Sequence, residues 1–182
     1  MTPDLFWIPG PWTGRLAIAK RPRGGDWLSE EFRSWRAAGI DVVVSLLEPV
    51  EANELGLLDE ASAAEKAGIR FLSFPVPDLG IPASVESHVH LLLSLRAALD
   101  RGDTVAIHCR QGIGRSGMMA VAALMFSGCK VEHSIALVSA ARGLTVPETA
   151  DQRAWLHGLS HSIRGANTSP SALASVTPPF SA

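Results

Sequence analysis

Hydrophobic and polar positions alternate along the chain in blocks that predict strands and helices in turn. Short apolar runs predict strands at residues 15–19, 40–48, 69–76 and 104–109. The second run is nearly continuous and rich in valine, which is typical of a strand buried on both faces. Residues 5–12, with two tryptophans, two prolines and a glycine, predict a packed but irregular lead-in.

The segments between these runs have helical periodicity. Helices are expected over about 26–39, 51–67, 85–99, 117–126, 131–141 and 148–162. Asp26 or Ser29 is expected to cap the first helix, and Gly39 to end it. Residues 117–126 are apolar on all sides, which predicts a central buried helix.

Strands that alternate with helices predict an α/β domain with a mostly parallel sheet and helices on both faces. One domain is expected over residues 1–164, followed by a small, polar, proline-bearing tail at 165–182 that is predicted to be disordered. Ligands in such sheets bind beyond the carboxyl ends of the strands. Two loops follow strands directly there, PDLGIP at 77–82 and HCRQGIGRSG at 108–117.

Composition and charge limit the partners and the location that are expected. The 182 residues carry a net charge of −2, which predicts no general affinity for nucleic acid or membrane surfaces. The most apolar segment, 118–126, is far shorter than the ~20 residues of a membrane span. Two cysteines are too few for a disulfide framework, and the N-terminus shows no signal peptide pattern, so a cytoplasmic location is expected.

The loop from Cys109 to Arg115 contains what phosphoryl transfer to a thiolate requires. A helix N-terminus and a nearby cation both lower the pKa of a thiol. Five intervening residues let successive backbone amides turn inward around a phosphoryl group, and the glycines 112, 114 and 117 permit that curvature. Arg115 can bind two phosphoryl oxygens with its planar guanidinium. A helix start at 116–117 completes the predicted cradle.

Other residues near these loops suit supporting roles. Asp78 can protonate the leaving oxygen and then accept a proton from water, although an aspartate after proline is also an ordinary turn residue. Ser116 can donate to the sulfur of Cys109 as it departs. His108 is expected to orient the loop through its ring N–H.

Other functions were weighed against this one. The segment also matches the G-x-G-x-x-G dinucleotide turn, but residues 130–140 predict a helix where that motif needs a strand ending near an acid. A buried structural role for Cys109, a phosphate-binding module without turnover and a rhodanese-like sulfur transferase are further alternatives. Sulfur transferase loops are one residue shorter and need no upstream acid, so Asp78 discriminates against them.

HCRQGIGRSG resembles the H-C-x5-R-[ST] loop of protein tyrosine and dual-specificity phosphatases. PVPDLGIP looks like their general-acid loop, and RGLTVPETADQ at 142–152 is similar to a segment of small dual-specificity and kinase-associated phosphatases. The resemblance spans about 40–156. It implies the nucleophile Cys109, the phosphate binder Arg115, the general acid Asp78 and the leaving-group donor Ser116. It also implies that loop residues bind substrate, namely Arg110, Gln111, Gly112, Ile113, Gly114 and Arg115, and that Gln152 positions water.

Two departures from tyrosine-specific enzymes favour a dual-specificity-like phosphatase. Val76 stands where those enzymes have tryptophan, and no segment resembles their phosphotyrosine-recognition loop. No metal or organic cofactor is implied. The expected partner is a phosphorylated protein or peptide. A phosphoinositide is the less favoured substrate, because Arg110 is the single basic residue between Cys109 and Arg115.

Overall fold

The computed structural model describes residues 3–167, except the side chains of residues 85–86 and 161–167. Its strands are β1 (Leu5–Ile8), β2 (Arg15–Ala19), β3 (Val42–Ser45), β4 (Arg70–Ser73) and β5 (Thr104–His108). Its helices are α1 (Leu28–Ala37), α2 (Pro49–Glu54), α3 (Glu60–Lys66), α4 (Val85–Asp100), α5 (Gly114–Phe126), α6 (Val131–Arg142) and α7 (Ala150–Asn167), with a 3-10 turn at Gly25–Trp27.

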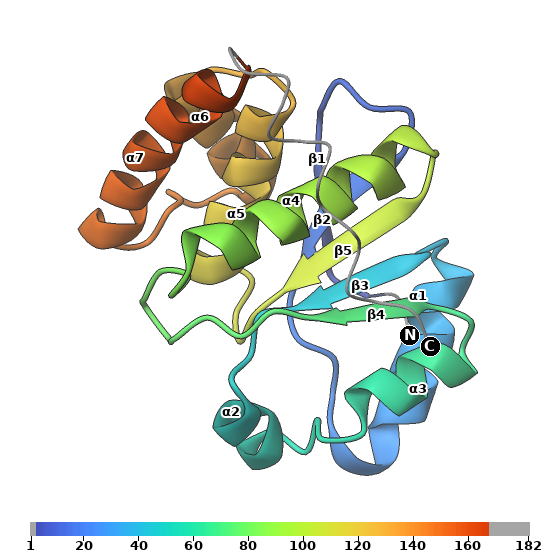
Figure 1. Cartoon of the computed structure of the whole chain (residues 1–182). Helices are drawn as coiled ribbons and strands as arrows, with labels where there is room; N and C mark the ends of the chain where they lie inside the picture. Colours follow the sequence, from blue (N-terminus) through green and yellow to red (C-terminus); the bar gives the residue numbers. More distant parts are fainter. Residues whose placement is uncertain (1–2, 168–182) are drawn as a thin grey trace.

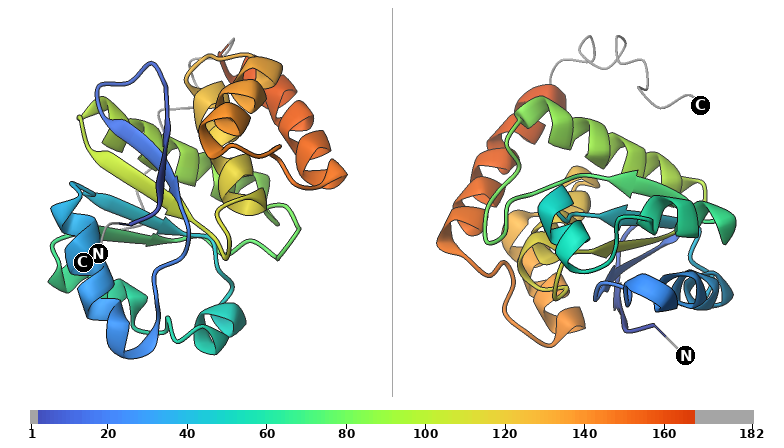
Figure 2. Two further views of the ribbon diagram at one scale, coloured as in Figure 1. Left: turned by 180° about the vertical axis from the view of Figure 1, so that it is seen from behind. Right: turned by 90° about the horizontal axis from the view of Figure 1, so that it is seen from below.

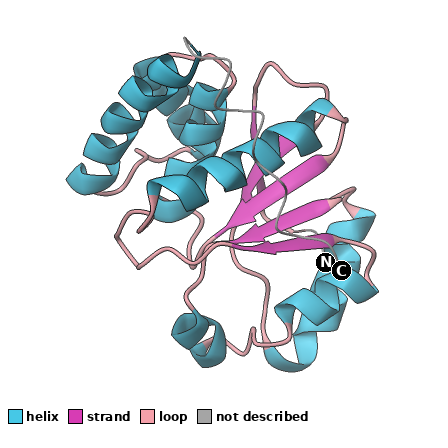
Figure 3. Ribbon diagram, in the orientation of Figure 1, coloured by secondary structure: helices cyan, strands magenta, loops and turns pink. Residues whose placement is uncertain are grey.

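The five strands form one sheet in the order β1-β2-β5-β3-β4, visible as magenta arrows in Figure 3. β1 runs antiparallel to β2, and the other pairings are parallel. This confirms the mostly parallel α/β fold. The parallel register places His108 beside Ser45, and Ser45 beside Ser73, so the strand ends that precede the two predicted site loops lie at one edge of the sheet.

Helices cover both faces of the sheet, and successive residues of a strand point to opposite layers (Figure 1). Val42 and Val44 lie in the core formed with α4, α5, α6 and α7, whereas Val43 lies in the core formed with α1 and α3. Figure 2 shows the sheet between the α4 and α1 layers in its right-hand view. Burial on both faces is the physical reason for the valine-rich run.

Helix α5 passes through the middle of the larger core. Its residues from Gly114 to Met125 are all buried, as expected for a helix that is apolar on all sides. It begins at Gly114, however, and not at residues 116–117 as predicted. The earlier start places Arg115 and Ser116 inside its first turn, where free backbone amides face the preceding loop.

Three local predictions are wrong. Residues 5–8 form the edge strand β1, because their backbone groups pair with those of β2. The prolines at 9 and 11 lie after the strand and do not interrupt this pairing. The helix expected over 51–67 is two helices, since Gly56 has φ +67 and its carbonyl accepts from the amide of Gly25. Neither Asp26 nor Ser29 caps α1, because a 3-10 turn leads directly into it.

The chain end was predicted as a tail from residue 165. Helix α7 extends to Asn167, three residues into that segment. Residues 168–182 lie outside the described part of the chain, so the predicted disorder there stays a prediction.

Candidate active site

A small cavity opens at the carboxyl edge of the sheet, where the loop after β5 turns into α5. Its volume is about 110 Å³. It is lined by Asp78, Leu79, Cys109, Arg110, Gln111, Ile113, Gly114, Arg115 and Glu148. The sheet topology therefore brings the two predicted site loops, which are about 30 residues apart in sequence, to one place.

The loop that forms the floor of this cavity is held in a tight curve. Gly112 has φ +67, and a Cβ at this position would lie 2.6 Å from the carbonyl oxygen of Ala19. Arg142 of α6 donates to the carbonyl oxygens of Gly112 and Gln111. Arg142 thus holds two carbonyls of the loop, while the backbone amides of Ile113 and Ser116 contact the thiol of Cys109.

Cys109 lies at the base of the cavity and is 3% exposed. Burial raises the pKa of its thiol, but four contacts outweigh burial and bring that pKa below its ordinary value. They are the hydroxyl of Ser116, 3.3 Å from the sulfur, the backbone amides of Ser116 and Ile113, and the positive charge of Arg115. The site thus favours a thiolate, the nucleophilic form of cysteine.

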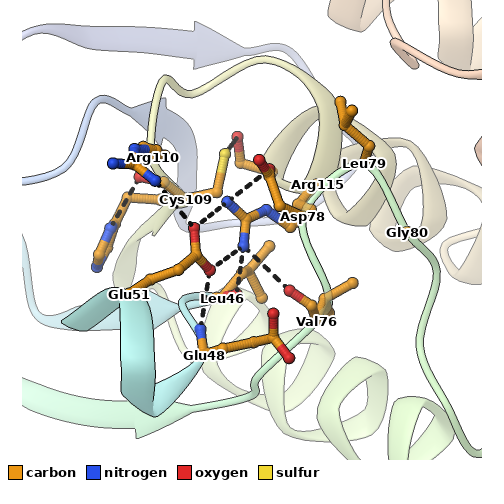
Figure 4. Close-up of polar contacts among 12 residues, drawn as sticks. Leu46, Glu48, Glu51, Val76, Asp78, Leu79, Gly80, Cys109, Arg110 and Arg115 are labelled. Atoms are coloured by element: carbon orange, nitrogen blue, oxygen red, sulfur yellow. Dashed lines mark hydrogen bonds and ion pairs between the residues drawn. The ribbon is translucent and has the colours of Figure 1, made fainter. Parts of the chain in front are cut away.

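Arg115 stands beside the thiol and is held by partners from three other segments (Figure 4). Its Nη1 lies 2.6 Å from Oε2 of Glu51 and its Nη2 lies 2.9 Å from Oε1, a two-point contact. Nη1 also donates to the carbonyl oxygen of Val76 at 3.0 Å and to that of Leu46 at 3.4 Å. These contacts set the direction of the guanidinium without using its Nε.

Asp78 reaches the same guanidinium from the loop after β4. Its Oδ1 lies 2.9 Å from Nη2 of Arg115, while its side chain is 57% exposed. The next residue, Leu79, has φ +59, a backbone conformation that side chains rarely adopt and that functional loops concentrate. The side chain of Asp78 thus lines the cavity and is partly exposed to solvent.

Thr149, which directly precedes α7, and Gln152, in the first turn of α7, hold this acid loop in place. Thr149 donates its hydroxyl to the carbonyl oxygen of Leu79 at 3.3 Å, and the fully buried Gln152 donates its amide to that of Gly80 at 3.1 Å. The side-chain oxygen of Gln152 accepts from the backbone amide of Glu148. Gln152 therefore contacts the acid loop, and the predicted role in placing water stays a prediction.

The predicted site residues divide into those that line the cavity and those that do not. The first group is Asp78, Cys109, Arg110, Gln111, Ile113, Gly114 and Arg115, and the second is His108, Gly112, Ser116 and Gln152. The Nδ1 of His108 lies 3.3 Å from the carbonyl oxygen of Cys109, and its role in orienting the loop stays a prediction.

Sequence reasoning missed two acidic residues near the thiol, Glu51 and Glu148. Glu148 lines the cavity, but it was noted only as the start of an expected helix and within the segment that resembles small phosphatases. Glu51 forms a capping box with Glu48 at the start of α2, directly after β3. Two glutamates three residues apart with a proline between them were the available signal, but this pattern indicates a helix start and not a contact with Arg115.

The structure also bears on alternatives and on other ligands. The segment after α5 is the helix α6, so the dinucleotide motif lacks the strand that it requires. Within residues 3–167, no three His, Cys, Asp or Glu side chains gather closely enough to hold a metal ion. None of the helices described is both long and apolar enough to cross a membrane.

The chain is similar in sequence to known phosphatases. Residues 17–129 match the family described as "Polymorphic toxin system, DSP-PTPase phosphatase". The chain is 33% identical over 106 residues to protein tyrosine phosphatase domain-containing protein 1 of Bos taurus. That alignment covers 54% of this chain and 13% of the bovine protein, so the chain spans only a small part of that relative's length.

Two solved structures extend the match. Tk-PTP in its active form is 31% identical, with a TM-score of 0.73, over 88% of this chain and 99% of that one. Kinase-associated phosphatase with its catalytic cysteine replaced by serine has a TM-score of 0.83 at 18% identity, over 90% of this chain and 97% of that one, which shows a shared fold. With the loop and cavity described above, these matches identify the chain as a member of the DSP-PTPase phosphatase family and a cysteine-dependent phosphatase.

Proposed function

We propose that this phosphatase hydrolyses phosphate monoesters on protein side chains, through a phosphocysteine formed on Cys109. The observation that carries the proposal is the meeting of three groups at one small cavity. These are a thiol whose pKa is lowered, the guanidinium of Arg115 and the carboxyl group of Asp78. Nucleophile, oxyanion binder and proton donor are what the reaction requires.

In the first step the thiolate of Cys109 attacks phosphorus, and the bond from phosphorus to the leaving oxygen breaks. Protonated Asp78 transfers its proton to that oxygen. The phosphoryl oxygens bind the loop amides and the guanidinium of Arg115, where they compete with Asp78 for Nη2. Displacement by phosphate frees the carboxyl group to face the leaving oxygen.

In the second step water attacks phosphorus and the bond from phosphorus to sulfur breaks. Asp78 accepts the proton of that water, and inorganic phosphate leaves. The thiolate departs with a hydrogen bond from Ser116, whose hydroxyl lies 3.3 Å from the sulfur. Cys109, Arg110, Gln111, Gly112, Ile113, Gly114 and Arg115 form the substrate-binding loop in this proposal.

Protein side chains are the proposed substrates for two reasons. The cavity is small, and the loop offers a single basic side chain, Arg110, beside the guanidinium of Arg115. A headgroup with several phosphates would need more cations around it than this. The resemblance to dual-specificity phosphatases points the same way.

The test compares wild type with Cys109→Ser and Asp78→Ala on p-nitrophenyl phosphate, in chelator, across roughly pH 5 to 8. We expect no turnover from the cysteine variant and loss of the basic limb in the aspartate variant. Asp78→Ala should lower kcat more on phosphoserine peptides than on p-nitrophenyl phosphate, because the poorer leaving group depends more on the acid. Asp26→Ala, at an exposed residue of the 3-10 turn, is the matched control.

Phosphopeptides and phosphoinositide vesicles are then compared at equal phosphate concentration. Higher kcat/KM on phosphopeptides supports a protein substrate, and preference for the vesicles contradicts it. Full activity of Cys109→Ser would contradict the mechanism itself.

A further inference from the structure

Behind the nucleophile, two buried ionisable side chains from distant elements meet. His108 ends β5 directly before Cys109 and is 0% exposed, and Glu60, the first residue of α3, is 3% exposed. Nε2 of His108 lies 2.8 Å from Oε1 of Glu60, within ion-pair distance. The contact is an ion pair when the imidazole is protonated.

The other contacts of His108 leave little freedom to its ring. Its Nδ1 lies 3.3 Å from the carbonyl oxygen of Cys109, and the ring of Trp35 packs against it in a T-shaped arrangement at a centroid distance of 6.1 Å. The imidazole thus has a carboxylate at one nitrogen, the backbone of the nucleophile at the other and an uncharged indole beside its ring.

Charge balance favours the protonated imidazole. Burial lowers the pKa of His108, but the carboxylate of Glu60 and the negative form of Cys109 outweigh burial and raise it. Of the neighbouring groups, these two carry the charge that acts on the ring, since Trp35 is neutral. An isolated buried carboxylate at Glu60 would be costly, and a paired imidazolium removes that cost.

We propose that Glu60 is a positioning residue of the phosphatase reaction, which keeps His108 protonated and so holds a buried positive charge behind the Cys109 thiolate. The proposal deepens the proposed function and rests on it, because it concerns Cys109 as the nucleophile. Interaction between two charged groups is reciprocal: if the thiolate favours the imidazolium, the imidazolium favours the thiolate to the same extent. Glu60 therefore acts on the nucleophile without touching the substrate.

The test measures the thiol itself and not turnover. In a Cys129→Ser background Cys109 is the single cysteine of the chain, and its alkylation by iodoacetamide is followed against pH. In Glu60→Gln we expect the midpoint of this curve to rise by about one pH unit, so alkylation at acidic pH slows about tenfold. Glu65→Gln, which removes an exposed carboxylate from the same helix, should leave the curve unchanged.

A mutant cycle separates charge from packing. His108→Gln should raise the midpoint by a similar amount, and adding Glu60→Gln to it should cause no further rise, because the carboxylate acts through the imidazole. Equal, independent shifts in the two single variants that add in the double variant would overturn the proposal.

The proposal can also be tested on the wild-type protein, without any substitution that could prevent folding. NMR of labelled histidine should show His108 protonated on both nitrogens at a pH above the ordinary pKa of a histidine side chain. A neutral His108 at pH 6 overturns the proposal, as does an unchanged alkylation curve in folded Glu60→Gln. If the alkylation shift is present while wild type fails to hydrolyse p-nitrophenyl phosphate, the proposed function fails and the role of Glu60 toward the thiol stands.

Discussion

Arg115 and Glu51 form a two-point ion pair, 2.6 Å and 2.9 Å between their atoms, with side chains that are 2% and 10% exposed. The glutamate comes from α2 and the arginine from α5, 64 positions along the chain. Such a contact fixes both the position and the plane of a guanidinium. The phosphate binder is therefore aligned before a substrate arrives.

Loss of this ion pair should reduce catalysis. Glu51→Gln retains the shape but removes the charge, so Arg115 is left buried with an incomplete partner. We expect kcat to fall roughly 100-fold, since small displacements of a binding group have effects of that order, and the free energy of unfolding to fall by about 3 kcal/mol. Steady-state kinetics and urea unfolding measure the two effects. The exposed Glu54 of the same helix, changed to Gln, should alter neither.

The ion pair between Arg115 and Glu51 makes the free energy of unfolding depend on pH. The hydrogen bonds from Arg115 lower the pKa of Glu51 more than burial raises it. A carboxyl group with a lowered folded-state pKa stabilises the protein above its unfolded value, and this contribution disappears as pH falls through the folded value. The difference in unfolding free energy between wild type and Glu51→Gln should therefore shrink between roughly pH 5 and pH 3. A difference that is constant with pH would contradict this assignment.

Ser116 should act mainly in the second chemical step. Its hydroxyl is buried and lies 3.3 Å from the sulfur that must leave as thiolate. In Ser116→Ala we expect slow hydrolysis of the phosphocysteine, and hence a burst of p-nitrophenol followed by a slower steady state. Rapid-quench kinetics detect the burst. Ser134→Ala removes another buried hydroxyl, one bonded to its own helix, and should show no burst.

Gln152 should affect catalysis by holding the acid loop in position. Replacement by alanine removes its hydrogen bond to the carbonyl of Gly80 and its bond from the amide of Glu148. We expect a fall in kcat of roughly tenfold with KM little changed, because Asp78 is less well placed in the transition state. A pH profile of kcat/KM that keeps its wild-type height would show that the loop holds without Gln152.

Gly112 should tolerate no side chain. Alanine there places Cβ 2.6 Å from the backbone oxygen of Ala19 and at φ +67. Gly68 has a similar φ of +75 with nothing within 4 Å, so Gly68→Ala reports the backbone strain alone, about 1 kcal/mol. Gly112→Ala should unfold at lower temperature than Gly68→Ala and lose most activity, since the phosphate loop must move. Equal melting temperatures would contradict the close approach.

Local pattern was enough for much of this protein. The spacing from Cys109 to Arg115, the upstream Asp78 and the buried helix after them are features of short segments, and they predicted the loop, its chemistry and its family. The valine run at 42–44 likewise predicted a strand buried on both faces, because apolar residues at successive positions give the strand two apolar faces.

Contacts between distant segments were decided only by the tertiary structure. Glu51 reads as the start of a helix and Glu60 as one acid in an alanine-rich segment, until the parallel strands bring α2 and α3 to the end of β5. The break at Gly56 and the strand at 5–8 likewise depend on partners elsewhere in the chain. A carboxylate is stable when buried only with a cation beside it, and the fold alone determines which cation that is.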